Sequence, residues 1–394
     1  MFSDRINRIQ PSATLEMTAK AAELRSQGID VINLSVGEPD FNTPQNIIKA
    51  AKKAMDSGFT KYTPGSGILD LRKAVCTKLK RDNLLNYEPT EVIVSCGGKH
   101  SLYNACQVLF QKNDEVIIFS PYWVSFPDFV SVTGAKPVFV KTDHNKQYEP
   151  DFDDLNSKIT KNTKGIIINS PSNPTGGVWS NEAIKNTLKI SKKHNLWVFS
   201  DECYEQLTYD SPFTSIATLT NDKNKILTFQ SCSKTYAMTG WRIGYTAGNI
   251  DVIKAMSKLQ GQSTSCPNSI AQYAAKEALI GEQSFVKKMR EIFKKRRQLI
   301  VDGLNHIPNV FCDFPGGAFY AFPNIEYFIN KNYNGKRIKS ATDLSMLMLN
   351  ELSIVTVAGN SFGSNNYIRL SYAASENDIK LALEKMNGLL SKIK

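Results

Sequence analysis

The chain has 394 residues, of which 41% are hydrophobic and 22% charged, and its formal net charge is +11. The composition is ordinary for a globular protein, and the length allows two or three domains with a sizeable core. No window holds about eighteen consecutive apolar residues and the N-terminus lacks a signal core, so we expect no membrane span. The lysines are scattered, so the charge indicates no nucleic-acid partner, and clusters such as residues 294–297 are expected on a solvated helix face.

The cysteines and histidines argue against two further classes of protein, those held by disulfides and those with a bound metal. Seven cysteines, an odd number, stand at irregular spacings without a C-x-x-C pair, and the four histidines are isolated. This pattern favours reduced thiols in a cytoplasmic protein over a disulfide framework, and it offers no metal-ligand spacing.

Predicted elements follow the chain in a regular order. A helix over residues 15–24 and a strand over 31–36 lead to Gly37, where the backbone can approach a ligand closely. Helices are expected next at 46–55 and 68–80, then strands at 92–95, 116–119, 136–140, 165–168, 197–199, 226–229 and 243–247, with a linker rich in aspartate at 151–154. Helices at 252–259, 269–278, 284–304 and 343–352 and strands at 354–357 and 367–371 complete the chain. Alternating strands and helices predict a parallel sheet with crossover helices.

Polar and aromatic residues follow several of these strands. Gly97, Gly98 and Lys99 stand between the strand 92–95 and a helix expected from about residue 101. The unpaired N–H groups and the dipole of a helix start attract an anion there. Trp123 follows the next strand, at the sheet edge where ligands of open α/β sheets bind, and either stacks on a planar ring or packs at the rim.

Asn173 and Asp201 follow two later strands. Asn173 stands between two proline-bearing turns that would hold its amide in place as a donor. Asp201 ends an apolar strand, where an ionised carboxylate is costly unless it meets a cation. Tyr204, three residues on, could direct its hydroxyl toward the same ligand.

Lys234 lies in a small-residue loop between two apolar runs, with Ser231 and Ser233 before it and Arg242 after it. A desolvated lysine near other cations can form imines, and hydroxyls with an arginine fork suit a phosphate dianion. These features predict pyridoxal phosphate held as a Schiff base, against the alternative of a surface lysine in a polar turn. Arg369, between Ile368 and Leu370, is either a rim charge or a carboxylate receptor.

Taken together, these segments resemble the class I aminotransferases of pyridoxal phosphate fold type I, and within them the bacterial aspartate aminotransferase branch that includes prephenate-using members. The markers are Pro11-Ser12-Ala13-Thr14, Gly37-Glu38-Pro39-Asp40-Phe41, Lys61-Tyr62, Gly97-Gly98-Lys99, Ser120-Pro121-Tyr122-Trp123, Asn173-Pro174-Thr175-Gly176, Asp201-Glu202-x-Tyr204, the Lys234 segment and Arg369-Leu370-Ser371. The resemblance implies an α/β fold, with a large domain over residues 45–285 built on a mostly parallel, seven-stranded sheet between helices. A smaller α+β domain would combine the N-terminal segment 1–44 with residues 286–394.

The same resemblance assigns roles around the cofactor. Lys234 would carry pyridoxal phosphate and then act as the base. Asp201 would hold the ring nitrogen protonated, Asn173 and Tyr204 would contact the ring's 3-oxygen, and Trp123 would stack on the ring. The phosphate group would be bound by Gly97, Gly98, Lys99, Ser231, Ser233 and Arg242, with Tyr62 contributed by the neighbouring subunit of a homodimer.

The resemblance also implies the substrates. Arg369 would bind the α-carboxylate with Asn173, Trp123 and the Gly37 backbone, and Lys99 with Thr14 would meet the distal carboxylate of a dicarboxylic acid. The implied reaction is transfer from L-aspartate to 2-oxoglutarate; the alternative is an aromatic amino acid or prephenate as substrate. Gln10 stands where prephenate-using relatives tend to carry a basic residue. Lys99 and Thr14 speak against a carbon–sulfur lyase on the same scaffold.

Overall fold

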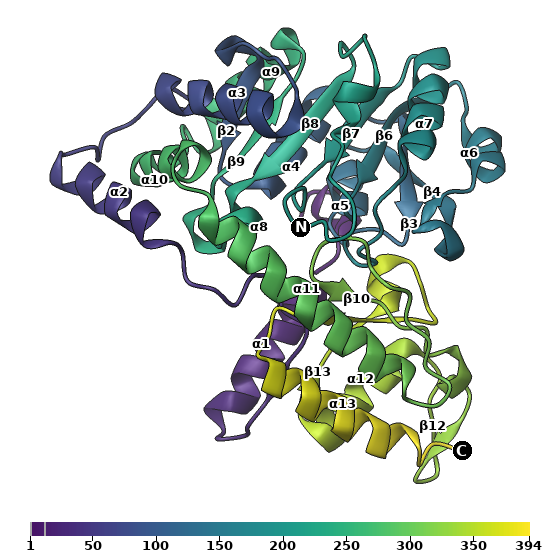
Figure 1. The fold of residues 1–394 in the computed structure, drawn as a ribbon. Coiled ribbons are helices and arrows are strands. Elements are labelled where there is room, and N and C mark those ends of the chain that lie inside the picture. The colour runs from purple at the N-terminus through teal and green to yellow at the C-terminus, as the bar shows by residue number, and fades with distance from the viewer. Residues whose placement is uncertain (1, 12) are drawn as a thin grey trace.

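The computed structural model describes residues 2–11 and 13–394, except for the side chains of residues 13–16 and 18. Its main sheet has eight strands, which Figure 1 shows in the upper part of the molecule. In spatial order they are β2 (Val92–Ser95), β9 (Gly244–Ala247), β8 (Ile226–Ser231), β7 (Trp197–Asp201), β6 (Thr163–Asn169), β3 (Glu115–Ser120), β4 (Lys136–Asp143) and β5 (Glu149–Pro150). The five strands from β8 to β4 are parallel, and β9 runs antiparallel to both neighbours. The predicted mostly parallel α/β sheet is therefore confirmed, and two-residue β5 adds an antiparallel edge to the seven expected strands.

Helices cover both faces of this sheet, because successive strand residues point to opposite sides. One face packs on α2 (Gln45–Asp56), α3 (Leu69–Asn83), α6 (Phe152–Lys158), α7 (Asn181–Lys193) and α10 (Ser269–Ile280). The other face packs on α4 (Gly98–Leu109), α5 (Phe126–Ser131) and α9 (Ile250–Ser263). In β6, for example, Ile166 and Ile168 join the first core, while Ile167 joins the second.

A second, smaller body lies below the sheet in Figure 1, and α11 (Ser284–Asn305) runs down into it. It holds α1 (Ala13–Ser26), α12 (Ala341–Leu352) and α13 (Glu376–Leu390). Its strands are short: β10 (Tyr320–Ala321), β15 (Ile368–Ser371) and β14 (Val357–Ala358) form one antiparallel sheet, β1 (Ile32–Asn33) pairs with β13 (Ile354–Val355), and β11 (Asn332–Tyr333) pairs with β12 (Lys336–Arg337). One core unites β1 with α11, α12 and α13, so segments far apart in sequence fold together.

One prediction about a polar stretch is wrong, and a second is confirmed only in part. The expected linker at 151–154 is the start of α6, because the Asp151 side chain accepts the N–H groups of Asp153 and Asp154 as an N-cap. In α11, Lys294 and Lys295 are exposed as predicted, but the next two residues are buried. Arg296 pairs with Asp40 at 2.7 Å, and Arg297 bonds Asp210 at 2.9 Å. Burial of these cations is possible because each is paired. No helix in the part of the chain described is long and apolar enough to cross a membrane.

Candidate active site

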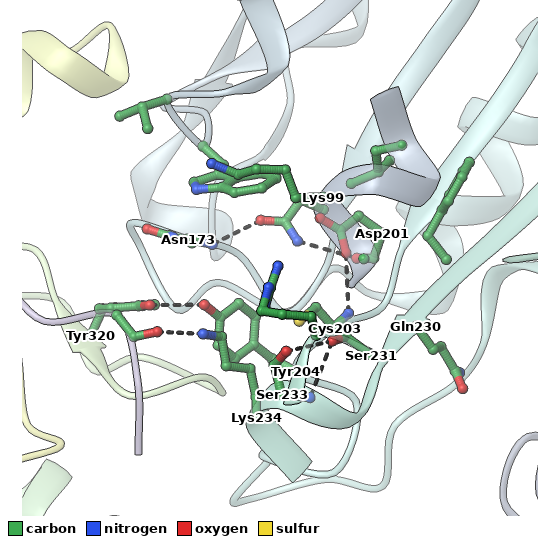
Figure 2. Close-up of a pocket in the computed structure, with 18 of the residues that line it drawn as sticks. Lys99, Asn173, Asp201, Cys203, Tyr204, Gln230, Ser231, Ser233, Lys234 and Tyr320 are labelled. Atoms are coloured by element: carbon green, nitrogen blue, oxygen red, sulfur yellow. Dashed lines mark hydrogen bonds between the residues drawn. The ribbon is translucent and has the colours of Figure 1, made fainter. Parts of the chain in front are cut away.

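A cavity of about 210 Å³ opens where the carboxyl ends of β6, β7 and β8 meet the start of α4 and the β10–β15 sheet. Most of the residues predicted from the sequence line it: Gly37, Gly98, Lys99, Trp123, Asn173, Asp201, Tyr204, Ser231, Ser233, Lys234, Arg242 and Arg369. Figure 2 shows Lys234, Asp201, Asn173 and Tyr204 converging on this space. The main sheet and the smaller body therefore each contribute side chains to one pocket.

Register explains why distant residues meet here. Asn169 at the end of β6 pairs with Asp201 at the end of β7, which pairs in turn with Phe229 of β8. Because the three strands are parallel, their last residues share one edge of the sheet. Asn169 was not predicted; its Nδ2 donates to the Asp201 carbonyl at 3.2 Å and its Oδ1 accepts the Asn173 N–H at 2.9 Å. A polar residue at the end of an apolar strand was the available signal.

The start of α4 forms an anion site with the loops beside it. The helix begins at Gly98 rather than near residue 101, and within the described residues the N–H groups of Gly98 and Lys99 have no partner. Gly97 lines this turn with φ 94°, and a Cβ there would collide with the Arg242 guanidinium. Free helix N–H groups beside an arginine are a donor set for a dianion.

Ser231 and Ser233 lie on the other side of the same site. Ser231 Oγ donates to Ser233 Oγ at 2.8 Å and accepts the Ser233 N–H at 3.1 Å. Through that second bond Ser231 caps α8 (Cys232–Thr235), so Lys234 lies on a single helical turn and not in the expected loop. The cap fixes the direction in which the Lys234 side chain leaves the backbone.

Lys234 points into the cavity, where its Nζ donates to the carbonyl oxygen of Gly37. Burial lowers the pKa of Lys234 below its ordinary value, and the positive charges of Arg242 and Arg369 act in the same direction. A lowered pKa raises the fraction of neutral amine, the form that acts as nucleophile or base. Lys234 therefore has the environment predicted from the sequence, a desolvated amine near other cations.

Asp201 is buried at the end of β7, and its Oδ1 accepts the Cys203 N–H at 3.2 Å. Burial raises the pKa of this carboxyl to about 7, and the adjacent Glu202 adds to the rise. Within the described residues it forms no ion pair, although it lines a cavity. A carboxyl in this position is suited to a ligand that brings its own positive charge.

Arg369 is 1% exposed, which excludes the rim charge that the sequence left open. Its Nη1 donates to Asn173 Oδ1 at 2.9 Å and its Nη2 to the Ser35 carbonyl at 2.7 Å, whereas its Nε has no partner in the part described. The guanidinium stands 4.5 Å from the centroid of the Tyr320 ring. No carboxylate pairs with this buried cation among the described residues, so it is available to an acid ligand.

Besides Asn169 and the apolar residues Leu102, Val124 and Phe229, three more residues that sequence reasoning missed line the cavity. Tyr320 bonds the Tyr204 hydroxyl at 2.8 Å, which fixes both rings, and Cys203 and Gln230 lie beside Asp201 and Ser231. The glycine-rich approach to Tyr320 in the sequence was the available signal. The sequence contained no comparable signal for Cys203 and Gln230, because neither residue type indicates a site by itself.

Three predicted site residues are not among those that line the cavity of this chain: Tyr62, Thr14 and Gly97, which lies in the turn before α4 beside Arg242. Tyr62 is 88% exposed and does not line the pocket. The side chain of Thr14, on α1, lies outside the described residues. Their roles stay predictions.

The family model for aminotransferase class I and II matches residues 29–386. The chain belongs to the class I and II aminotransferases. It is 43% identical to the aspartate aminotransferase of Bacillus sp. (strain YM-2) over 98% of both chains, and 43% identical to the aspartate/prephenate aminotransferase of Cereibacter sphaeroides, again over 98% of both. The solved aspartate aminotransferase of Rhizobium meliloti has a TM-score of 0.96 at 40% identity and covers 100% of both chains. The family resemblance stated from the sequence is confirmed.

This aminotransferase depends on pyridoxal phosphate, as its family does, and its pocket fits that group. The free N–H groups at Gly98 and Lys99 with Ser231, Ser233 and Arg242 form a donor set for the phosphate. The amine of Lys234 and the carboxyl of Asp201 reach the same cavity from α8 and β7. The buried, unpaired Asp201 matches a protonated ring nitrogen, because each charge offsets the burial cost of the other.

Proposed function

We propose that this aminotransferase transfers the amino group of L-aspartate to 2-oxoglutarate, giving oxaloacetate and L-glutamate. The observation that carries the proposal is a pair of cations, Arg369 and Lys99, that line the pocket of Lys234 without a carboxylate partner among the described residues. Two cations in one cavity suit substrates with two carboxylates. A solved relative from Thermus thermophilus, 38% identical with a TM-score of 0.93, was determined with maleate, a dicarboxylate.

In the proposed complex, Arg369 binds the α-carboxylate. Its planar guanidinium can form two parallel bonds to a carboxylate, and Asn173 and Ser35 already hold it in orientation. Asn173, Trp123 and the Gly37 backbone line the same end of the substrate. Lys99, with Thr14, receives the distal carboxylate.

Pyridoxal phosphate supplies an aldehyde that accepts the amino group and a ring that takes up the electrons released at the substrate α-carbon. Lys234 holds the cofactor at rest and then moves the proton at the substrate α-carbon, for which its lowered pKa suits it. Asp201 would keep the ring nitrogen protonated. Asn173 and Tyr204 would bind the ring's 3-oxygen, and Trp123 would stack on the ring face.

We expect Lys99→Ala to lower kcat/KM for aspartate by about 10–100-fold, because a dicarboxylate loses a charge-assisted bond. For phenylalanine, which has no distal carboxylate, kcat/KM should change by less than about threefold. Steady-state kinetics with both amino acids measure the two values. Lys112→Ala, at an exposed lysine outside the pocket, is the matched control. Equal losses with both substrates would contradict the assignment of Lys99.

The alternative substrates are aromatic amino acids or prephenate on the same scaffold. Two observations favour this alternative. The cavity also has apolar walls, among them Leu102, Val124 and Phe229, and several relatives bear the name aspartate/prephenate aminotransferase. Gln10 carries no positive charge where prephenate-using relatives tend to carry one. Comparing kcat/KM for aspartate, phenylalanine and prephenate on purified protein decides between these substrates.

We further propose a homodimer in which Tyr62 reaches the phosphate in the neighbouring subunit. The 88% exposure of this ring in the single chain supports a role outside its own fold. Tyr62→Phe should weaken cofactor binding about tenfold or more, since a hydrogen bond to a charged group is lost. Titration of apoenzyme with cofactor measures the change, and light scattering gives the mass. Tyr327→Phe, at another exposed tyrosine, should bind as the wild type does; a monomer with full cofactor affinity would contradict the proposal.

The domain division is proposed at residues 45–285 for the large domain, with 1–44 and 286–394 forming the small one. Separate apolar cores support this division, although Tyr204, Leu207 and Tyr209 pack into the smaller core. Hinge motion between the two would let the small domain, which carries Gly37 and Arg369, close over the substrate. A cytoplasmic location is proposed from the seven free cysteines.

A further inference from the structure

Lys99 and the short helix α5 lie against the same indole ring. The Lys99 ammonium stands 5.0 Å from the centroid of the Trp123 ring. Phe126 and Phe129 of α5 make edge contacts with that ring, with centroids 5.3 and 5.7 Å from it. Asp128 lies in the first turn of α5, so its carboxyl is carried by a helix that packs on the same ring as Lys99.

The charges around Lys99 come from two elements. Its pKa is lowered by burial and by Arg242, and Asp128 acts in the opposite direction. The two groups are not in direct contact, since Lys99 has neither a hydrogen bond nor an ion pair within 4.0 Å among the described residues. Asp128 therefore compensates the ammonium in part and leaves its donors free for a ligand.

Asp128 is held in place by the N-terminal segment. The Gln10 N–H donates to Asp128 Oδ1 at 3.2 Å, across 118 residues of sequence. Burial raises the pKa of this carboxyl, while the Gln10 N–H and Lys99 lower it and so favour the charged form. The carboxyl is half-buried, which strengthens its interaction with Lys99 relative to an exposed acid.

We propose that Asp128 is a specificity-determining residue, a built-in counter-charge that lets the Lys99 end of the pocket accept uncharged side chains as well as carboxylates. A dicarboxylic substrate brings its own negative charge to Lys99. An aromatic substrate brings none and would bury the ammonium with only Asp128 to offset the cost. This inference rests on the proposed role of Lys99 as receptor of the distal carboxylate.

The test is Asp128→Asn, which removes the charge but keeps an oxygen that can accept the Gln10 N–H. We expect the ratio of kcat/KM for aspartate over phenylalanine to rise about fivefold to thirtyfold. The change should be in KM, because the residue does not touch the reacting atoms. As a second readout, calorimetry should show tighter binding of maleate and weaker binding of 3-phenylpropanoate, which measures selectivity without turnover.

Two further variants separate charge from structure. Asp128→Ala should shift the ratio of kcat/KM values as Asp128→Asn does. Any lower stability of Asp128→Ala relative to Asp128→Asn measures the contribution of the hydrogen bond from Gln10. In the Lys99→Ala background, Asp128→Asn should leave the ratio unchanged, because the interacting cation is gone. Asp222→Asn, at an acid that lines a separate surface groove, is the control for net charge.

The outcomes distinguish the role inferred for Asp128 from the role proposed for Lys99. If Lys99→Ala shifts the ratio and Asp128→Asn does not, Asp128 sets no specificity and the inference is overturned alone. If Lys99→Ala itself leaves the ratio unchanged, the assignment of Lys99 fails and both are overturned. A shift by Asp128→Asn that persists without Lys99 would also refute the counter-charge.

Discussion

Lys234→Ala should lose more than about 10⁴-fold in kcat, the largest effect of any single change in this chain. Losing a general base alone typically costs 10²–10⁴-fold, and this substitution removes the covalent attachment of the cofactor as well. Single-turnover kinetics with aspartate measure the loss. Lys234→Arg keeps a positive charge without a nucleophilic amine, and it should be equally inactive.

Chemical trapping gives an independent readout of the same assignment. The wild-type protein should be yellow, and borohydride followed by peptide mass spectrometry should recover the cofactor on Lys234. Lys254→Ala, at an exposed lysine of α9, should keep both colour and activity. Label recovered on another lysine would refute the assignment of the site.

Asp201→Asn should lower kcat/KM by roughly 30–5000-fold, which corresponds to the 2–5 kcal/mol lost when one member of a buried charge pair is removed. An amide of the same shape cannot stabilise a protonated ring nitrogen. Glu202→Gln is the matched control, because Glu202 is equally buried but its Oε1 accepts the hydroxyls of Ser200 and Ser215. A kinetic loss in Glu202→Gln as large as that in Asp201→Asn would contradict a specific role for Asp201.

The same substitution should change how the stability of the apoenzyme depends on pH. The pKa of Asp201 rises from 3.8 to about 7 on folding, so the folded protein binds more protons than the unfolded chain between these values. The free energy of unfolding of the wild-type apoenzyme therefore falls as pH rises from about 4 through 7. Asp201→Asn has no carboxyl at this position, so its free energy of unfolding lacks this decrease. Urea unfolding should show equal stability of the two near pH 4 and an advantage of a few kcal/mol for the variant above pH 7. A difference that does not grow with pH would contradict the burial of an unpaired carboxyl.

Bound cofactor should reverse the order of these two proteins above pH 7. In the wild-type holoenzyme the ring cation offsets the cost of the ionised carboxyl, and the cofactor adds its own binding free energy to the folded state. Asp201→Asn gains less from cofactor because its amide carries no charge. Unfolding curves with and without cofactor measure the two gains.

Local sequence signals predicted elements best where the apolar pattern is unbroken. β2 has the predicted bounds because its apolar residues Val92, Ile93 and Val94 precede the turn at Gly97, and α11 was predicted from its apolar residues at helical spacing. The start of α4 was placed three residues late, because Gly98 is a poor helix former whose helical position depends on its neighbours in space. The burial of Arg296 and Arg297 could not be predicted, since Asp40 and Asp210 lie far away in sequence.

By itself the sequence determined the α/β alternation, the lysine with its two serines and arginine, and the acid that ends β7, because each depends on neighbours within a few residues. Only the tertiary structure decided that Arg369 is a buried receptor and that Gln10 holds Asp128 near Lys99. Those facts depend on contacts across 118 residues or more, from Gln10 to Asp128 and from Arg369 to Asn173 and Ser35. Strand register and the packing of the apolar cores set such contacts, and no local pattern encodes them.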